Sequence, residues 1–313
     1  MREEIIVSGR NNPLIDPHLA IWEWQIPSYL FLGGLAAGIL FFAGLYTVLK
    51  KEKEFKAAVG IAPLVTPVLL VLGLFFLFLD LKHKLYFWQL YTTINLESPM
   101  SWGAWVLMII APVSIIWSAI HIKNAFPFWD WKFTILKDLE AFFLKHKTEL
   151  AWIMMISSVV LGIYTGILLS AFNARPLWNT SILGPLFLTS GLSTGAAAII
   201  LLSKSHAERL AFAKIDLMLI AIEIFLIVHM LMGFRASTQV QIEASRLFLG
   251  GEFTTVFWVF VVALGLVIPA LLEVFELKHR KVPYLVAPVL VLVGGLVFRF
   301  IMVHAGQVSR WLY

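Results

Sequence analysis

Hydrophobic positions along this chain form long runs, separated by short stretches that hold most of the charged residues and prolines. A helix of about 20 apolar residues spans the hydrocarbon core of a bilayer. The pattern predicts an all-α integral membrane protein with eight transmembrane helices. They are expected at residues 28–49, 57–79, 101–122, 151–172, 181–203, 212–234, 255–276 and 284–303.

Composition supports this fold class and excludes several functions. The 313 residues are 60% hydrophobic and only 14% charged, which excludes an ordinary soluble domain. The chain has no cysteine, so it forms no disulfide and supplies no thiolate to an iron–sulfur cluster. The polar start of the chain has no apolar core typical of a cleaved signal peptide, and the first span is expected to direct insertion.

The positive charges predict an orientation. Lys and Arg are more frequent in the loops after spans 1, 3, 5 and 7 than in the other loops and the two ends. By the positive-inside rule these four loops are cytoplasmic, and the segments 1–27 and 304–313 face outward. The net charge of +5 therefore indicates topology and not a nucleic-acid site.

Two segments suggest further organisation. Residues 126–147 alternate aromatic and aliphatic residues with Lys and Asp, which predicts a cytoplasmic helix in the headgroup layer; a partner-binding surface is the alternative. The sequences "FLGGLAAG" at 31–38 and "LTSGLSTG" at 188–195 resemble each other in spans 1 and 5, which predicts two parallel four-helix halves. Their small-xxx-small spacing favours close helix packing, and no strand precedes them as in a phosphate-binding loop.

Tyr164 is unusually deep for a polar residue. It precedes Phe172, the expected end of its helix, by about 12 Å of helix rise. A hydroxyl group at that depth needs a hydrogen-bond partner, either on another helix or on a ligand such as a quinone head group.

Asp80 closes its helix, where the helix dipole disfavours a carboxylate. It either pairs with Lys82, His83 or Lys84, or exchanges protons with a bound redox molecule. Pro99 suits the start of the next helix, and Ser98 is expected to cap it. Trp88, Trp102 and Trp178 are predicted to form an outer aromatic belt.

Three charged residues lie within spans of the second half. Asp216 and Glu223 are expected on one face of their helix, and Arg299 is the candidate counter-ion. They form either a structural ion pair or a proton path. His229 and His304 are weak candidates for haem ligands, so no haem and no metal site are expected.

Several of these stretches resemble the NrfD/PsrC-like family, the membrane subunits of polysulfide reductase and related molybdenum-enzyme complexes. The resemblance runs from about residue 22 to 307 in the order of the chain. It rests on "YLFLGGLAAG" at 29–38, "LDLKHKLYFWQL" at 79–90, "SPMSWGAW" at 98–105, "YTGILLS" at 164–170, "PLWN" at 176–179, "SGLSTGAA" at 190–197, "GGLVFR" at 294–299 and "AGQ" at 305–307.

The resemblance implies two four-helix bundles in a prokaryotic cytoplasmic membrane, at 28–172 and 173–303, with a quinone site in the first bundle at the outer face. It also implies two partners, a ferredoxin-like iron–sulfur subunit and a molybdopterin catalytic subunit. The implied activity is oxidation of menaquinol or another quinol, with electrons passing through the partners to polysulfide, sulfur, thiosulfate, tetrathionate or another acceptor. A proton- or ion-translocating subunit is the alternative function.

The resemblance also implies site residues. Tyr164 matches a tyrosine that contacts the quinone head group, and Asp80 matches the acidic residue beside it. Some relatives have Asn and His in the first turn of helix 1, where this protein departs from the pattern; Tyr29 is the expected substitute and Gln25 the next. His83 and Trp102 lie in the matching stretches and complete the predicted cofactor-binding set.

Overall fold

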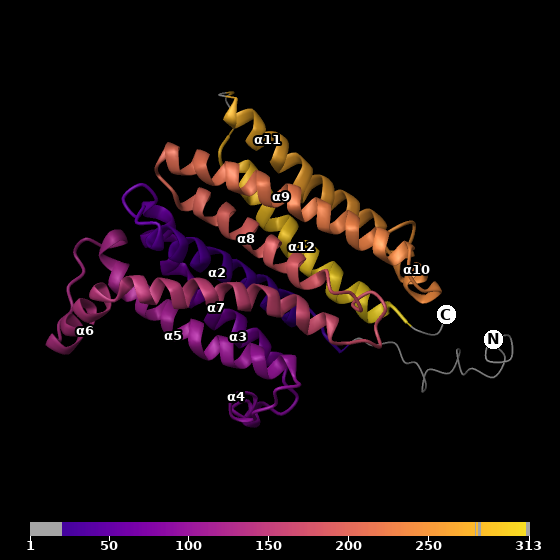
Figure 1. The fold of residues 1–313 in the computed structure, drawn as a ribbon, viewed down its shortest axis with the longest axis horizontal. Helices are drawn as coiled ribbons and strands as arrows, with labels where there is room; N and C mark the ends of the chain where they lie inside the picture. The colour runs from indigo at the N-terminus through magenta and orange to yellow at the C-terminus, as the bar shows by residue number, and fades with distance from the viewer. Residues whose placement is uncertain (1–20, 279, 281–282, 311–313) are drawn as a thin grey trace.

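The computed structural model describes residues 21–278, 280 and 283–310, and every regular element in this part of the chain is helical (Figure 1). The elements are α2 (Gln25–Val48), η1 (Ala57–Ile61), η2 (Ala62–Val65), α3 (Thr66–Asp80), η3 (Lys84–Tyr86), α4 (Gln89–Thr92), α5 (Pro99–Ala125), α6 (Thr134–Lys145), α7 (Lys147–Ser170), α8 (Leu183–Leu202), α9 (His206–Arg235), α10 (Gln239–Arg246), η4 (Val256–Val267), α11 (Ile268–Leu277) and α12 (Val286–Val308).

Eight helices in the described residues are long and apolar enough to cross a membrane, which confirms the predicted fold class. Two of them are composite: η1, η2 and α3 form one span, and η4 and α11 form another. Helices extend beyond several predicted ends because backbone hydrogen bonding continues into polar residues. For example, α9 begins at His206, where the Ser205 side chain accepts a hydrogen bond from the backbone of Glu208.

The long helices lie side by side and run obliquely across Figure 1, from upper left to lower right. Helix α2 is central: it packs against α3 and α7 of the first four spans, and against α8 and α12 of the last four. Helices α8, α9, α11 and α12 pack among themselves on the other side. The boundaries at 28–172 and 173–303 stay a prediction, because α2 contacts α7 and α8 alike.

The two glycine-rich segments meet each other. A Cβ atom at Gly195 would overlap the backbone of Gly38, and one at Gly34 would lie 3.7 Å from the Cα of Gly191. The backbones of α2 and α8 are therefore in direct contact, as the small-xxx-small spacing predicts.

The described residues begin and end at one end of the bundle, which we call the terminal end (Figure 1). The Gln307 side chain accepts hydrogen bonds from the backbone N–H groups of Ile21 at 3.0 Å and Trp22 at 2.9 Å. It also donates to the Trp22 carbonyl at 2.8 Å. These bonds fix the start of α2 against the last turn of α12.

The loop after α7 is also anchored to α12. Trp178 is 2% exposed and donates to the carbonyl of Met302 at 2.8 Å, and Arg175 donates to the carbonyl of Ser309 at 2.9 Å. The prediction that Trp178 belongs to an outer aromatic belt is wrong, because its indole N–H finds a protein acceptor inside the bundle.

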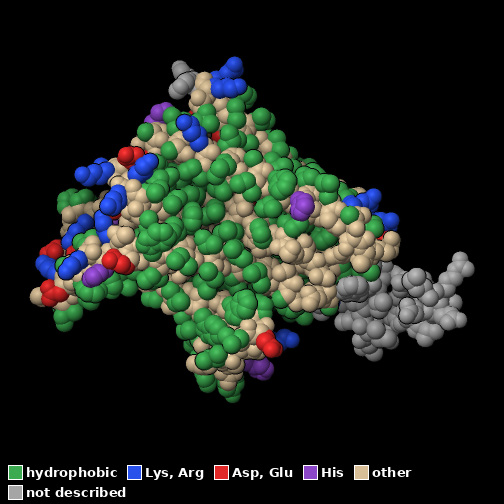
Figure 2. All heavy atoms as spheres, viewed as in Figure 1, with side chains coloured by type: hydrophobic (Ala, Val, Ile, Leu, Met, Phe, Trp, Pro, Cys, Tyr) green, Lys and Arg blue, Asp and Glu red, His purple; other side chains and the backbone are tan. Residues whose placement is uncertain are grey.

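At the opposite end, α6 begins at Thr134 rather than near residue 126, because "FPFWDW" precedes it and Pro127 disfavours helix in the residue before it. Exposed Ile135, Leu139 and Phe142 lie on it, and Lys123 pairs with Glu140 across 2.8 Å. On the face in Figure 2, most Lys and Arg side chains gather toward this end, beyond a wide hydrophobic band. Its cytoplasmic position stays a prediction.

Candidate functional site

A cavity lies between α2, α3, α5 and α7 near the terminal end, and it collects several predicted site residues. Its volume is about 90 Å³, which is room for several water molecules. Tyr29, Asp80 and Tyr164 all line it, and most of the remaining wall is apolar or aromatic. That wall consists of Trp22, Ile26, Leu77, Leu81, Leu90, Tyr91, Met100, Ala104, Leu107 and Leu168.

Two tyrosines form the polar centre of the cavity. Tyr29 of α2 is 3% exposed and Tyr164 of α7 is 6% exposed, and their hydroxyl groups lie close enough to interact. When one of two neighbouring hydroxyl groups donates to the other, the second keeps a proton that it can donate to a third group. Helix α7 ends at Ser170, which puts Tyr164 about 9 Å below the helix end, not the predicted 12 Å.

Gly103 of α5 makes room for Tyr164. A Cβ atom at Gly103 would overlap the ring and hydroxyl oxygen of Tyr164. The aromatic ring therefore lies directly on the α5 backbone, a position that any larger residue would block. The adjacent Ala104 lines the cavity itself.

Asp80 is the last residue of α3, and the backbone leaves the helix at Leu81. The carboxylate is partly buried at the rim of the cavity, and no salt bridge to Lys82, His83 or Lys84 forms among the described residues. Ser98 precedes α5 without a capping hydrogen bond from its side chain, so the predicted cap is wrong, whereas Pro99 does begin the helix.

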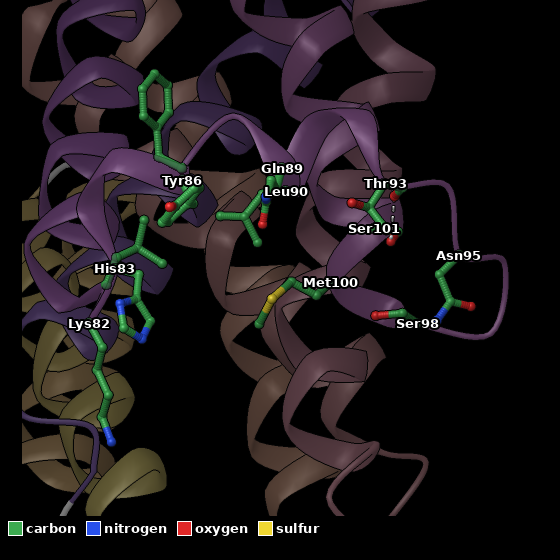
Figure 3. Close-up of a pocket in the computed structure, with 12 residues that line it drawn as sticks. Lys82, His83, Tyr86, Gln89, Leu90, Thr93, Asn95, Ser98, Met100 and Ser101 are labelled. Atoms are coloured by element: carbon green, nitrogen blue, oxygen red, sulfur yellow. Dashed lines mark hydrogen bonds between the residues drawn. The ribbon is translucent and has the colours of Figure 1, made fainter.

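His83 lines a second, larger cavity of about 440 Å³ beside the first (Figure 3). Both cavities share Leu81, Leu90 and Met100 as walls. Figure 3 shows His83 and Lys82 on one side of this space and Ser98 and Asn95 on the other. A volume in this range is typical of small-molecule sites.

The other two predicted binding residues lie outside both cavities. Trp102 is 45% exposed, and its indole donates to the carbonyl of Leu96 at 2.9 Å. Gln25 lies in the first turn of α2, and its buried Oε1 has no hydrogen-bond partner among the described residues. Their roles in binding stay predictions.

Tyr91 is a wall residue that the sequence reasoning missed. It lies in a short loop helix, outside the membrane spans, and its partial burial raises the pKa of its hydroxyl above the ordinary value. In the sequence Tyr91 is one of two tyrosines in the loop between predicted spans, and nothing there distinguishes it from Tyr86.

A second polar cluster lies in the other half of the protein. Arg299 of α12 is 2% exposed and donates to the Ser190 hydroxyl and the Phe187 carbonyl, both at 3.1 Å. The buried Glu223 lies close enough to Arg299 and Ser190 to interact with both. Among the described residues Arg299 forms no salt bridge with either carboxylate, so the predicted ion pair is an electrostatic neighbour and not a direct contact.

The other carboxylate has a partner that the sequence reasoning missed. Asp216 accepts a hydrogen bond from Ser193 at 2.5 Å, and its carboxyl group lies close to that of Glu273 on α11. Two carboxyl groups side by side repel each other unless one of them is protonated. The signal for Glu273 was an acidic residue inside a predicted span, close to its end.

Four buried atoms of this cluster lack hydrogen-bond partners among the described residues, namely Asp216 Oδ2, both carboxyl oxygens of Glu273 and Arg299 Nε. Buried polar atoms without protein partners usually bind ordered water. No group of three or more His, Asp or Glu side chains in the described ranges is arranged to hold a metal ion. His229 is exposed on α9 and His304 lines a groove at the terminal end.

Comparison with known proteins gives consistent matches over almost the whole sequence. The family profile described as polysulphide reductase, NrfD matches residues 12–309. Protein NrfD of Escherichia coli is 31% identical over 310 residues, covering 92% of this protein and 96% of the relative. The C subunit of polysulfide reductase from Wolinella succinogenes is 29% identical over 301 residues, covering 92% and 94%.

A homologue of protein NrfD from Haemophilus influenzae is 27% identical over 327 residues, covering 95% of this protein and 97% of the relative. These matches agree with the eight spans and with the order of the sequence motifs. The protein therefore belongs to the NrfD family of membrane subunits in polysulfide reductase-type complexes.

Proposed function

We propose that this subunit oxidises a membrane quinol at the cavity between α2, α3, α5 and α7. The quinol is menaquinol or a related quinol. The observation that carries the proposal is the Tyr29–Tyr164 hydroxyl pair inside an apolar wall, with Asp80 at the rim. A quinone ring suits apolar and aromatic walls, and its two oxygens need hydrogen-bond partners. The residues present therefore fit this group.

The roles of the side chains follow from their chemistry. One tyrosine hydroxyl donates its proton to the other tyrosine, and the second hydroxyl donates its proton to one oxygen of the head group, which binds and orients the ring. The Asp80 carboxylate accepts the two protons one after the other and passes each to water at the terminal end. When bound, a quinol supplies two electrons and two protons.

The electrons must leave to another subunit. With no cysteine in this protein, thiolate-bound clusters have to belong to a partner. We propose a ferredoxin-like iron–sulfur subunit docked at the terminal end, which passes the electrons to a molybdopterin catalytic subunit. The relative in Wolinella succinogenes is named as one component of a polysulfide reductase, which supports a multi-subunit complex.

A Tyr164→Phe variant tests this function in the purified complex. We expect quinol-driven reduction of the iron–sulfur clusters to slow about tenfold, the value for one lost hydrogen bond of about 1.4 kcal/mol. Reduction of the clusters by dithionite should be unchanged. Tyr46→Phe is the matched control, because Tyr46 is buried and stacks on Phe55 at 3.7 Å, away from the cavity. Equal slowing in both variants would contradict the proposal.

Proton translocation is a second candidate function, favoured by the buried Asp216–Glu273 pair and the unpaired polar atoms near it. Buried acids inside a membrane protein often mark proton relays. Glu223→Gln should abolish quinol-driven proton uptake into liposomes, while Glu243→Gln, at a surface pair with Arg246, should not. Full proton coupling in Glu223→Gln would refute this second function.

A further inference from the structure

The segment 82–97 between α3 and α5, which we call the arm, exposes large apolar side chains on most of its surface. Leu85 is 86% exposed, Ile94 77% and Leu96 71%. Within the arm only Leu90 and Tyr91 are even half-buried, and both line the inner cavity. Contiguous exposed apolar surface of this kind is uncommon on a water-facing loop and marks contact with lipid or protein.

The position of the arm points to lipid. It projects sideways from the bundle beside α5, rather than beyond the terminal end (Figure 1). The projection at the bottom of Figure 2 is largely hydrophobic. Its apolar surface continues that of the two neighbouring spans, where Phe75 of α3 and Met108 and Ile109 of α5 are exposed.

The polar residues of the arm fit the edge of a bilayer. Lys82 and Lys84 flank its first turn, and long basic side chains extend from apolar surfaces toward lipid phosphates. Tyr86 and Trp88 are about half exposed, as is common for aromatic residues at membrane interfaces. A partner subunit docked at the terminal end would leave this lateral face open.

Between the arm and the start of α5 lies the open pocket of about 440 Å³ shown in Figure 3, which shares Leu81, Leu90 and Met100 with the inner cavity. The inner cavity, at about 90 Å³, is too small for a bicyclic ring unless neighbouring side chains move. Leu90 and Met100 are flexible side chains on the arm and at the start of α5, so rotation of both would join the two cavities.

We propose that the arm is embedded in the lipid–water interface and covers a lateral passage that leads a long-tailed quinol from the bilayer to the tyrosine pair. Leu90 and Met100 separate the passage from the inner cavity. The passage rests on the proposed quinol oxidation, whereas the contact of the arm with lipid is measured without any activity.

Lipid contact is tested by labelling a single cysteine introduced into this subunit, which has no native cysteine; wild-type complex treated in the same way gives the background from partner subunits. The Ile94→Cys variant of the intact complex carries an environment-sensitive fluorophore in nanodiscs that contain lipids spin-labelled near the headgroup. Glu252→Cys, in an exposed loop at the terminal end, is the control. We expect strong loss of fluorescence at position 94 and little at 252. Unquenched fluorescence at position 94 would overturn the proposal, also where a partner subunit and not lipid covers the label.

Passage is tested with an Ile94→Ser/Leu96→Ser double variant, since both side chains lie outside the two cavities. The apparent KM for a long-tailed quinol should rise about fivefold, and that for a tail-less, water-soluble quinol should stay unchanged. An equal effect on both quinols, or no effect on either, would refute the passage. Failure of the proposed function looks different, because wild-type complex would then oxidise neither quinol.

Discussion

Gly103→Ala is the sharpest test of how the tyrosine pair is positioned. The added Cβ would overlap the Tyr164 ring, so either the ring rotates away from Tyr29 or α5 and α7 separate. Neither helix backbone can yield without disturbing its neighbours, because α7 also packs against α2 and α8. The substitution is therefore expected to break the hydroxyl pair.

The magnitude follows from two opposing terms. Overpacking by one carbon atom costs about 1–3 kcal/mol in the free energy of unfolding. Replacing glycine by alanine inside a helix returns about 1 kcal/mol. The net loss of stability is thus about 0–2 kcal/mol, whereas quinol-driven cluster reduction should fall by about tenfold or more as the hydrogen bond to the head group is lost.

Gly33→Ala is the matched control, because Gly33 lies in α2 near Tyr29 and a Cβ there would meet nothing within 4 Å. Both variants are measured for thermal unfolding of the complex and for cluster reduction by quinol and by dithionite. Gly33→Ala should keep wild-type activity. Wild-type quinol activity in Gly103→Ala would refute the claim that Tyr164 must lie against α5.

Two further predictions concern stability. Arg299→Gln should lower the free energy of unfolding by about 3–5 kcal/mol, because it leaves buried Glu223 without a counter-charge. The control Arg246→Gln, at an exposed pair, should lower it by less than about 1 kcal/mol, and equal melting temperatures of the two variants would contradict the prediction. Gln307→Ala removes three hydrogen bonds to residues 21 and 22 and should cost about 1–3 kcal/mol; hydrogen exchange at Trp22 should accelerate, and unchanged protection would argue against the anchoring role.

Helices were predictable from the sequence because the bilayer imposes local requirements. Each span must be apolar over a fixed length and must satisfy its own backbone hydrogen bonds, so its position can be read from one stretch of sequence. Close helix packing at Gly38 and at Gly195 was predictable for a similar reason, since small residues at that spacing permit close approach. That the two segments pack against each other became visible only in the structure. The depth of Tyr164 needed correction only because α7 ends at Ser170.

Part of the candidate site was also visible in the sequence. Asp80 and Tyr164 stood out as polar groups at the end of, or inside, apolar spans. Tyr29 was predicted only as the substitute for the first-turn residues of the family, and the structure brings all three to one cavity. His83 and Trp102 were chosen for their place in the same stretches, but the structure puts them in a neighbouring cavity and on the surface. Proximity in the sequence did not distinguish the two groups.

What only the tertiary structure decided is which side chains face one another. The place of Tyr164 against Gly103, the contact of Asp216 with Glu273 and the bond from Trp178 to α12 all join residues on different elements. Each depends on the rotation of a helix about its axis, and that rotation is set by packing against several neighbours at once. The sequence by itself determined the eight spans and the polar residues inside them, because lipid acts on every span separately. The site depends on the way the spans pack together.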